Sequence, residues 1–181
     1  MTSKMEYTNE QRLRMLQEAL GIDPKATRAY QAAPAPLHVA SSYKKLDFSG
    51  KQLTKIPDLS KYHNLQVLKL SVNSISKIEN FDLPKLIELQ LSINKITKIE
   101  NLDALTKLKN LHLAGNKIST LEGLDKLENL EWLDIQLNSI SKLDALESLP
   151  KLSMLHINCN KIDPSDPCIE RLRKKVWDVY I

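Results

Sequence analysis

Leucine and isoleucine recur along the middle of this chain in a fixed arrangement. Between Tyr43 and Ile162 one unit occurs six times, with apolar residues at its positions 1, 4, 6 and 11. Five copies carry an asparagine at position 9, spaced by 21 or 22 residues: Asn73, Asn94, Asn116, Asn138 and Asn160. Positions 4 and 6 are separated by one residue, and this period of two predicts a short strand with one buried face in every repeat.

The residues at positions 4 and 6 form six apolar pairs that we expect to point into the core. These pairs are Leu46/Phe48, Leu68/Leu70, Leu89/Leu91, Leu111/Leu113, Leu133/Ile135 and Leu155/Ile157. Repeats of this length bury their apolar faces by stacking against neighbouring copies. The pattern therefore predicts an α/β solenoid of six repeats, with a parallel sheet on its concave face.

The asparagine of each repeat has a structural task. Where the chain leaves the strand and turns, main-chain N–H and C=O groups are stranded inside the coil, and a carboxamide can both donate to and accept from them. Stacked copies would form a ladder between coils, so we expect Asn73→Leu to cost on the order of 1 to 3 kcal/mol. The first repeat carries Lys51 in place of asparagine, as a terminal repeat often departs from the pattern.

The pattern divides the chain into three parts. Residues 1–42 form a helical segment and an Ala/Pro-rich connector, residues 43–162 the repeats, and residues 163–181 a C-terminal capping helix. Apolar residues at helical spacing support the two end helices: Leu13, Leu16 and Leu20, and then Ile169, Leu172 and Val176. The C-terminal helix should cover the last coil. The N-terminal helix either caps the first coil or binds a partner.

Composition narrows the class of protein. No apolar run approaches the ~18 residues that a membrane span needs, and none follows Met1 as a secretion signal would. Two cysteines, Cys159 and Cys168, are too few for a disulfide framework. We therefore expect an intracellular, cytoplasmic protein, with a nuclear or axonemal place left open, that does not bind membranes.

The net charge of +4 raises the question of nucleic acid. A row of lysines after the strands runs beside a row of acids, which predicts a solvated, salt-bridged flank. The two rows are Lys55, Lys77, Lys98 and Lys142, and Glu79, Glu100, Glu122 and Asp144. A second basic cluster, Arg171, Arg173, Lys174 and Lys175, is expected on the solvated side of the C-terminal helix. Without aromatic residues along a basic groove, we expect no nucleic-acid binding.

Function in such a solenoid is expected on the outward positions of the concave sheet. Trp132 and Met154 should be neighbours on adjacent strands, with further apolar area from Val72, Ile93 and Leu137. Exposed tryptophan is common among residues that dominate protein interfaces, although Trp132 could instead only shield its neighbours. The candidate partner-binding residues are Val67, Lys69, Glu88, His112, Trp132, Asp134, Met154 and His156.

The row His112, Asp134 and His156 also has the ligand types of an open metal site. Adjacent strands lie ~4.8 Å apart, so the two imidazoles would be about twice that distance from each other and converge poorly on one ion. Polar recognition of a partner, with histidine protonation as a source of pH sensitivity, is the favoured interpretation. We expect no cofactor, no metal and no catalytic residue.

The segments 77–80 (KIEN), 98–105 (KIENLDAL) and 116–124 (NKISTLEGL) resemble the 22-residue class of leucine-rich repeats. That class is typified by the regulatory subunit of protein phosphatase 1. The chain is also similar in size and repeat number to the leucine-rich-repeat light chain of outer-arm axonemal dynein. A leucine-rich-repeat protein of a spliceosomal particle is a third relative, and the bacterial internalins share the period but need a secretion signal.

The resemblance implies a non-enzymatic, monomeric scaffold that grips a protein partner on its concave sheet. By this resemblance the candidate partners are a phosphatase catalytic subunit and, as the alternative, a dynein heavy chain. Glu88, Trp132 and Asp134 would fill the acidic and aromatic roles that the phosphatase regulator uses on that face.

Overall fold

A computed structural model describes residues 43–79, 81–176 and 178–180. The chain divides into two units, and every element discussed below belongs to the second, Ser41–Ile181. The helix and connector predicted within residues 1–42 lie outside the described residues. Within the described ranges, no helix has the length and the apolar character that crossing a membrane requires.

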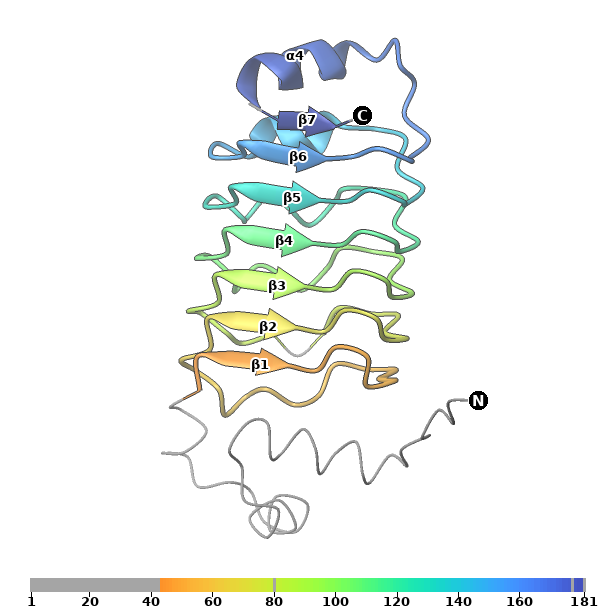
Figure 1. Ribbon diagram of the computed structural model, residues 1–181. Coiled ribbons are helices and arrows are strands. Elements are labelled where there is room, and N and C mark those ends of the chain that lie inside the picture. The colour runs from red at the N-terminus through yellow and green to blue at the C-terminus, as the bar shows by residue number, and fades with distance from the viewer. Residues whose placement is uncertain (1–42, 80, 177, 181) are drawn as a thin grey trace, which may run out of the picture. The chain divides into compact units, whose positions relative to one another are not determined.

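One parallel sheet runs the length of the second unit (Figure 1). Its strands are β1 (Lys45–Asp47), β2 (Val67–Lys69), β3 (Glu88–Gln90), β4 (Asn110–His112), β5 (Trp132–Asp134), β6 (Met154–His156) and β7 (Asp178–Tyr180). They lie in chain order, each paired in parallel with the next, and equivalent repeat positions are in register. The predicted parallel-sheet solenoid is therefore confirmed for the repeats.

The C-terminal end differs from the prediction. The helix α4 occupies only Pro167–Lys175, and Val176 returns to an extended conformation (φ −107°, ψ 126°). The chain then adds β7 beside β6, with Leu155 paired to Val179, so the sheet has seven strands rather than six. The repeat pattern ends at Ile162, so it could not predict a strand that forms by main-chain pairing with the edge of the last repeat.

The core follows the predicted apolar pairs. Both members of every pair in the second to sixth repeats are buried, whereas Leu46 and Phe48 of the first repeat are only partly buried. From α4 the core also receives Cys168, Ile169 and Leu172. A continuous column of leucine and isoleucine thus runs behind the sheet from repeat to repeat.

The asparagine ladder is present as predicted. Asn94 donates from Nδ2 to the carbonyls of Leu91 and of Leu70 in the preceding coil, both at 3.0 Å. Its Oδ1 accepts from the Ile75 N–H at 3.0 Å. The other four ladder asparagines repeat this arrangement. Each amide therefore satisfies main-chain groups in two coils at once.

The residue before each ladder position has a left-handed backbone. These residues are Gly50, Val72, Ile93, Gly115, Leu137 and Cys159, with φ between 55° and 66°. The N–H groups of the first five donate to carbonyls of the next repeat, as that of Ile93 does to Ala114 at 2.7 Å. Glycine adopts this conformation freely, but an L side chain loses roughly 1–2 kcal/mol there, and valine and isoleucine are rare in it.

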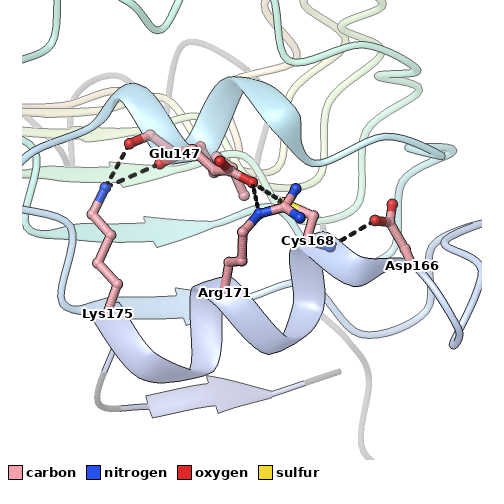
Figure 2. Close-up of polar contacts among 6 residues, drawn as sticks. Glu147, Asp166, Cys168, Arg171 and Lys175 are labelled. Atoms are coloured by element: carbon pink, nitrogen blue, oxygen red, sulfur yellow. Dashed lines mark hydrogen bonds and ion pairs between the residues drawn. The ribbon is translucent and has the colours of Figure 1, made fainter.

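Helix α4 is clamped to the 3-10 helix η1 (Asp144–Ser148) (Figure 2). Glu147 accepts hydrogen bonds from Arg171 Nε at 2.6 Å and from Cys168 Sγ at 3.1 Å, and its carbonyl accepts from Lys175 Nζ at 2.9 Å. The side chain of Asp166 caps the helix by accepting from the Cys168 N–H at 2.8 Å.

The basic residues of α4 are largely solvated, as predicted, since Arg171, Arg173 and Lys174 are exposed and Lys175 is partly buried. Arg171 and Lys175 are directed onto η1 (Figure 2), and Arg173 pairs with Glu170 at 3.1 Å. Burial, together with the Glu147 carboxylate, raises the pKa of the Cys168 thiol to about 12, so this thiol stays protonated and unreactive. Its hydrogen bond and that of Arg171 lower the pKa of Glu147.

The lysine and acid rows of the flank are not joined by ion pairs in the described residues. The salt bridges there are Lys109–Glu131, Lys126–Asp125, Arg171–Glu147 and Arg173–Glu170, and none involves either row. The predicted salt-bridged flank was wrong, because side chains at this exposed edge remain solvated instead of losing rotamer freedom in pairs.

Candidate protein-binding surface

Strand register places the predicted binding residues on one face, which we call the sheet face. It consists of the outward residues of β1 to β6, in two rows that cross the strands. The first row is Lys45, Val67, Glu88, Asn110, Trp132 and Met154, and the second is Asp47, Lys69, Gln90, His112, Asp134 and His156. All eight predicted partner-binding residues lie in these two rows.

Three aromatic rings meet at the β4 to β6 end of the sheet face, and we call them the aromatic cluster. The Trp132 indole stands edge-on to His112, with ring centroids 4.6 Å apart and planes at 72°. On the other side it stands edge-on to His156, at 6.1 Å and 68°. Met154 is directly beside Trp132 in register, and its side chain is exposed. The cluster and Met154 together form a contiguous, largely apolar area.

The indole N–H of Trp132 is an exception to hydrogen-bond satisfaction. Its Nε1 atom is buried and has no hydrogen-bond partner among the described residues. Buried donors usually have an acceptor, and functional sites are a common place for exceptions. The ring as a whole is only partly buried. The Nε1 atom is thus covered by neighbouring atoms, while part of the ring remains exposed.

Asp134 is the predicted binding residue that differs most from expectation. Its side chain is 9% exposed, although its position in the strand is outward. The carboxylate accepts from the main-chain N–H and the Nε2 of Gln136, both at 3.3 Å. It is therefore placed to hold Gln136 and to act on the neighbouring imidazoles, with little surface left for direct contact.

The charge state of His112 is shaped by the same neighbourhood. Burial lowers the pKa of its imidazole, while the carboxylates of Asp134 and Glu88 oppose that effect. His156 and Lys69 add to the lowering. The neutral form is thus favoured near neutral pH. An uncharged ring next to Trp132 keeps this part of the sheet face apolar.

The other end of the sheet face is polar. Val67, Lys69 and Glu88 are partly buried on β2 and β3. Gln90 Nε2 donates to Glu88 Oε1 at 2.5 Å, so the acid is held by its own strand. The structure therefore divides the predicted residues into an aromatic group on β4 to β6 and a polar group on β2 and β3.

The two imidazoles and Asp134 do lie in register on neighbouring strands. Even so, across residues 43–79, 81–176 and 178–180 no three His, Cys, Asp or Glu side chains are grouped closely enough to hold a metal ion. Trp132 contacts both imidazoles with its own ring.

A second apolar feature lies beyond the strand ends. Val72, Ile93 and Leu137 are the large apolar residues with a left-handed backbone, and we call them the turn ridge. Sequence reasoning counted them as part of the concave sheet. The structure instead places them after β2, β3 and β5, at the turn that leads into the asparagine ladder. The sequence held one sign of this ridge. These three repeats carry a large apolar residue at the position where two other repeats carry glycine.

Comparisons with known proteins agree with this architecture. A family model described as leucine-rich repeats in two copies matches residues 84–126 and 128–167. Among curated proteins no match is found. The matched repeats identify the repeated unit of this chain as a leucine-rich repeat.

Several solved structures share the fold. A leucine-rich-repeat protein of Leptospira interrogans is 28% identical over 81% of this chain, with a TM-score of 0.68. Two Listeria monocytogenes proteins, an internalin and internalin C2, are each 23% identical over 84% and 81% of the chain, with TM-scores of 0.61 and 0.55. This chain spans 40% of the Leptospira protein, 53% of the internalin and 83% of internalin C2. At 23% identity the internalin similarity concerns the fold alone.

Proposed function

We propose that this leucine-rich-repeat protein is a non-catalytic scaffold that binds a protein partner on its sheet face. Solenoids of this kind use their extended sheet surfaces for protein binding, which supports the general role. The aromatic cluster beside the exposed Met154 carries the proposal for this chain. It is a contiguous apolar area on an otherwise polar face, built on rigid strands.

Binding would occur on a surface that is already formed. The outward residues of β4 to β6 are held by strand pairing and by the core behind them, so little conformational freedom is lost on docking. Trp132 is the central anchor, since buried tryptophan contributes strongly at interfaces. Glu88, Lys69 and Val67 would form the polar and peripheral contacts on the β2 and β3 side.

The finer assignment follows the resemblance of the repeats. The partner is a phosphatase catalytic subunit, in the manner of a regulatory subunit, or alternatively a dynein heavy chain, in the manner of an axonemal light chain. In either role the protein acts as a monomer in the cytoplasm or on a cytoplasmic assembly, without nucleic acid or membrane.

Affinity purification with the full chain tests the proposal. Wild type, Trp132→Ala and Met154→Lys are immobilised, and captured proteins are identified by mass spectrometry. The Met154 variant removes exposed apolar surface without opening the core. Ala104→Lys is the matched control, because it also adds a lysine at an exposed apolar residue, outside both the sheet face and the turn ridge. Circular dichroism checks that each variant is folded.

We expect both sheet-face variants to lose the same partner, which the control retains. For a purified partner the dissociation constant should rise roughly 30-fold with Trp132→Ala, the value of a typical interface hot spot. Capture of dynein heavy chain or of phosphatase catalytic subunit decides the finer assignment. An identical partner set for wild type and both sheet-face variants would reject binding at the sheet face.

A further inference from the structure

The turn ridge contributes little to the fold that carries it. Val72, Ile93 and Leu137 are 54%, 59% and 57% exposed, so most of each side chain remains in water. Each also has a left-handed backbone that disfavours an L side chain. Gly50 and Gly115 occupy the same repeat position without that strain. Strain that is not compensated by burial directs attention to a contact outside the chain.

The shape of the ridge is set by the repeat. Val72 and Ile93 belong to adjacent coils, and Gly115 leaves a gap before Leu137. A Cβ built on Gly115 would lie 3.4 Å from Ile93 Cγ1, so the isoleucine borders that gap. The ridge thus presents two adjacent apolar side chains, a recess one residue wide, and a third side chain.

Charge is distributed on one side of the ridge. In each repeat the residue after the ladder position lies two residues beyond the ridge position. These residues are Gln52, Ser74, Lys95, Lys117, Ser139 and Lys161. The three lysines are exposed, and their ammonium groups make no hydrogen bond or ion pair with the described residues. On the sheet side the ridge borders uncharged residues, namely Ser71, Ser92, Ala114, Gln136 and Asn158. The ridge therefore has an uncommitted basic border and no acidic one.

The main chain of the ridge is not available for pairing. The N–H groups of Val72, Ile93, Gly115 and Leu137 each donate to the carbonyl of a residue in the next repeat, at 2.7 to 3.0 Å. An extended peptide therefore has no free ladder of donors to join. A ligand here must bind through side chains, and a helix with one apolar face is a peptide ligand that does so.

We propose that the turn ridge binds an acidic amphipathic helix of a protein partner. Neighbouring strands of a sheet lie ~4.8 Å apart, close to the ~5.4 Å turn of an α-helix. A helix lying along the stack would place one apolar residue per turn on each coil, with its largest side chain over Gly115. Acidic residues beside that apolar face would meet Lys95, Lys117 and Lys161. This surface is separate from the sheet face of the proposed function.

Selection of displayed peptides tests the proposal with the full chain. A yeast-displayed library of random peptides about 16 residues long is sorted on the wild-type protein. Enriched peptides are synthesised, and their affinities are measured by fluorescence anisotropy. We expect enriched sequences to combine apolar residues at intervals of three and four with aspartate or glutamate beside them. They should be helical when bound, as circular dichroism can verify.

Variants then locate the binding. Ile93→Asn/Leu137→Asn and, separately, Lys95→Glu/Lys117→Glu should each weaken the peptide about tenfold or more. Asparagine suits the left-handed backbone, so the first pair should fold. Lys107→Glu/Lys174→Glu makes the same charge change away from the ridge, at exposed lysines, and should leave the affinity within about twofold. Trp132→Ala should do likewise, which separates this surface from the sheet face.

Several results would overturn the ridge proposal. These are failure to enrich any peptide, enriched peptides without acidic residues, or equal affinity for wild type and Ile93→Asn/Leu137→Asn. Tighter, Lys95- and Lys117-dependent binding of a single-stranded oligonucleotide, or of vesicles containing phosphatidylserine, would reassign the border to those ligands. Loss of peptide binding in Trp132→Ala alone would move the site to the sheet face.

Discussion

Ile93 and Asn94 are consecutive residues with opposite surroundings. Asn94 is 8% exposed and bonds to main-chain groups of two coils, so its side chain is required by the inside of the solenoid. Ile93 is 59% exposed with a strained backbone, and the inside of the solenoid does not account for its side chain. The same division separates the ladder from the turn ridge in the neighbouring repeats.

This contrast separates residues that serve the fold from residues available for binding. Inward positions are nearly identical among repeats because each must satisfy the same main-chain groups and fill the same volume. Outward positions vary, and a costly choice there suggests an external contact. The aromatic cluster has features of both kinds of residue. Trp132 is partly buried, yet its Nε1 has no acceptor among the described residues.

Asn94→Leu should have the largest effect. The change leaves the Ile75 N–H and the carbonyls it served without this partner, so we expect a loss of about 2 to 5 kcal/mol in the free energy of unfolding. Urea denaturation followed by circular dichroism measures it. Asn158→Leu is the control, because among the described residues its side chain makes only a weak hydrogen bond, to Cys159 Sγ at 4.0 Å. Equal losses in the two variants would remove the distinction between inside and outside.

Leu172→Ala should be next in size. Leu172 is 1% exposed on α4, and truncating a buried leucine typically costs 2 to 5 kcal/mol. We expect about 2 kcal/mol or slightly more, because a helix at the end of the stack can settle into the space. Lys174→Ala on the exposed side of the same helix should change stability by less than about 0.5 kcal/mol. Thermal unfolding that is insensitive to Leu172→Ala would show that α4 does not cover the core.

Ile93→Asn should leave stability unchanged or raise it by up to about 1 kcal/mol, the reverse of the usual effect of removing isoleucine. The gain comes from asparagine's tolerance of the left-handed backbone, and little burial is lost. The midpoint of urea unfolding measures this, with Ile96→Asn, at a fully buried position, as the destabilised counterpart. A loss above about 1 kcal/mol would mean that Ile93 supports the fold after all.

The smallest effect concerns His112. Its pKa in the folded protein is lowered by burial below the ordinary value of 6.5, so the unfolded chain takes up the proton more readily. His112 therefore makes its full contribution to the free energy of unfolding above about pH 6.5. That contribution is lost as the pH falls toward the pKa of the folded protein. His112→Gln should flatten the pH dependence of unfolding below about pH 7 relative to wild type. Parallel curves would contradict burial as the cause.

Much of the candidate site was predictable from the repeat alone. Once the frame is set, residues 21 or 22 apart fall on adjacent strands, so the pairing of Trp132 with Met154 follows from counting. The ladder role of Asn94 follows in the same way from its fixed position after the strand. Both depend only on a local pattern that each copy restates.

Other features depend on contacts that no pattern of spacing contains. Asp134 is outward by count but is covered in the fold, and the left-handed backbone of Ile93 is set by the turn rather than by its own preference. The contacts of Arg171 and Lys175 with Glu147 join segments more than twenty residues apart, through side-chain directions that helical spacing does not specify.

The amino-acid sequence by itself determined the solenoid, its core, its ladder and the membership of its outward rows, because a periodic chain must solve the same burial problem in every coil. Tertiary structure alone decided the features that do not follow the repeat period. It added β7 to the open edge of β6, clamped α4 to η1, covered the Trp132 N–H, and separated the turn ridge from the sheet face. Each of these depends on which groups were left unpaired or exposed after the coils had stacked.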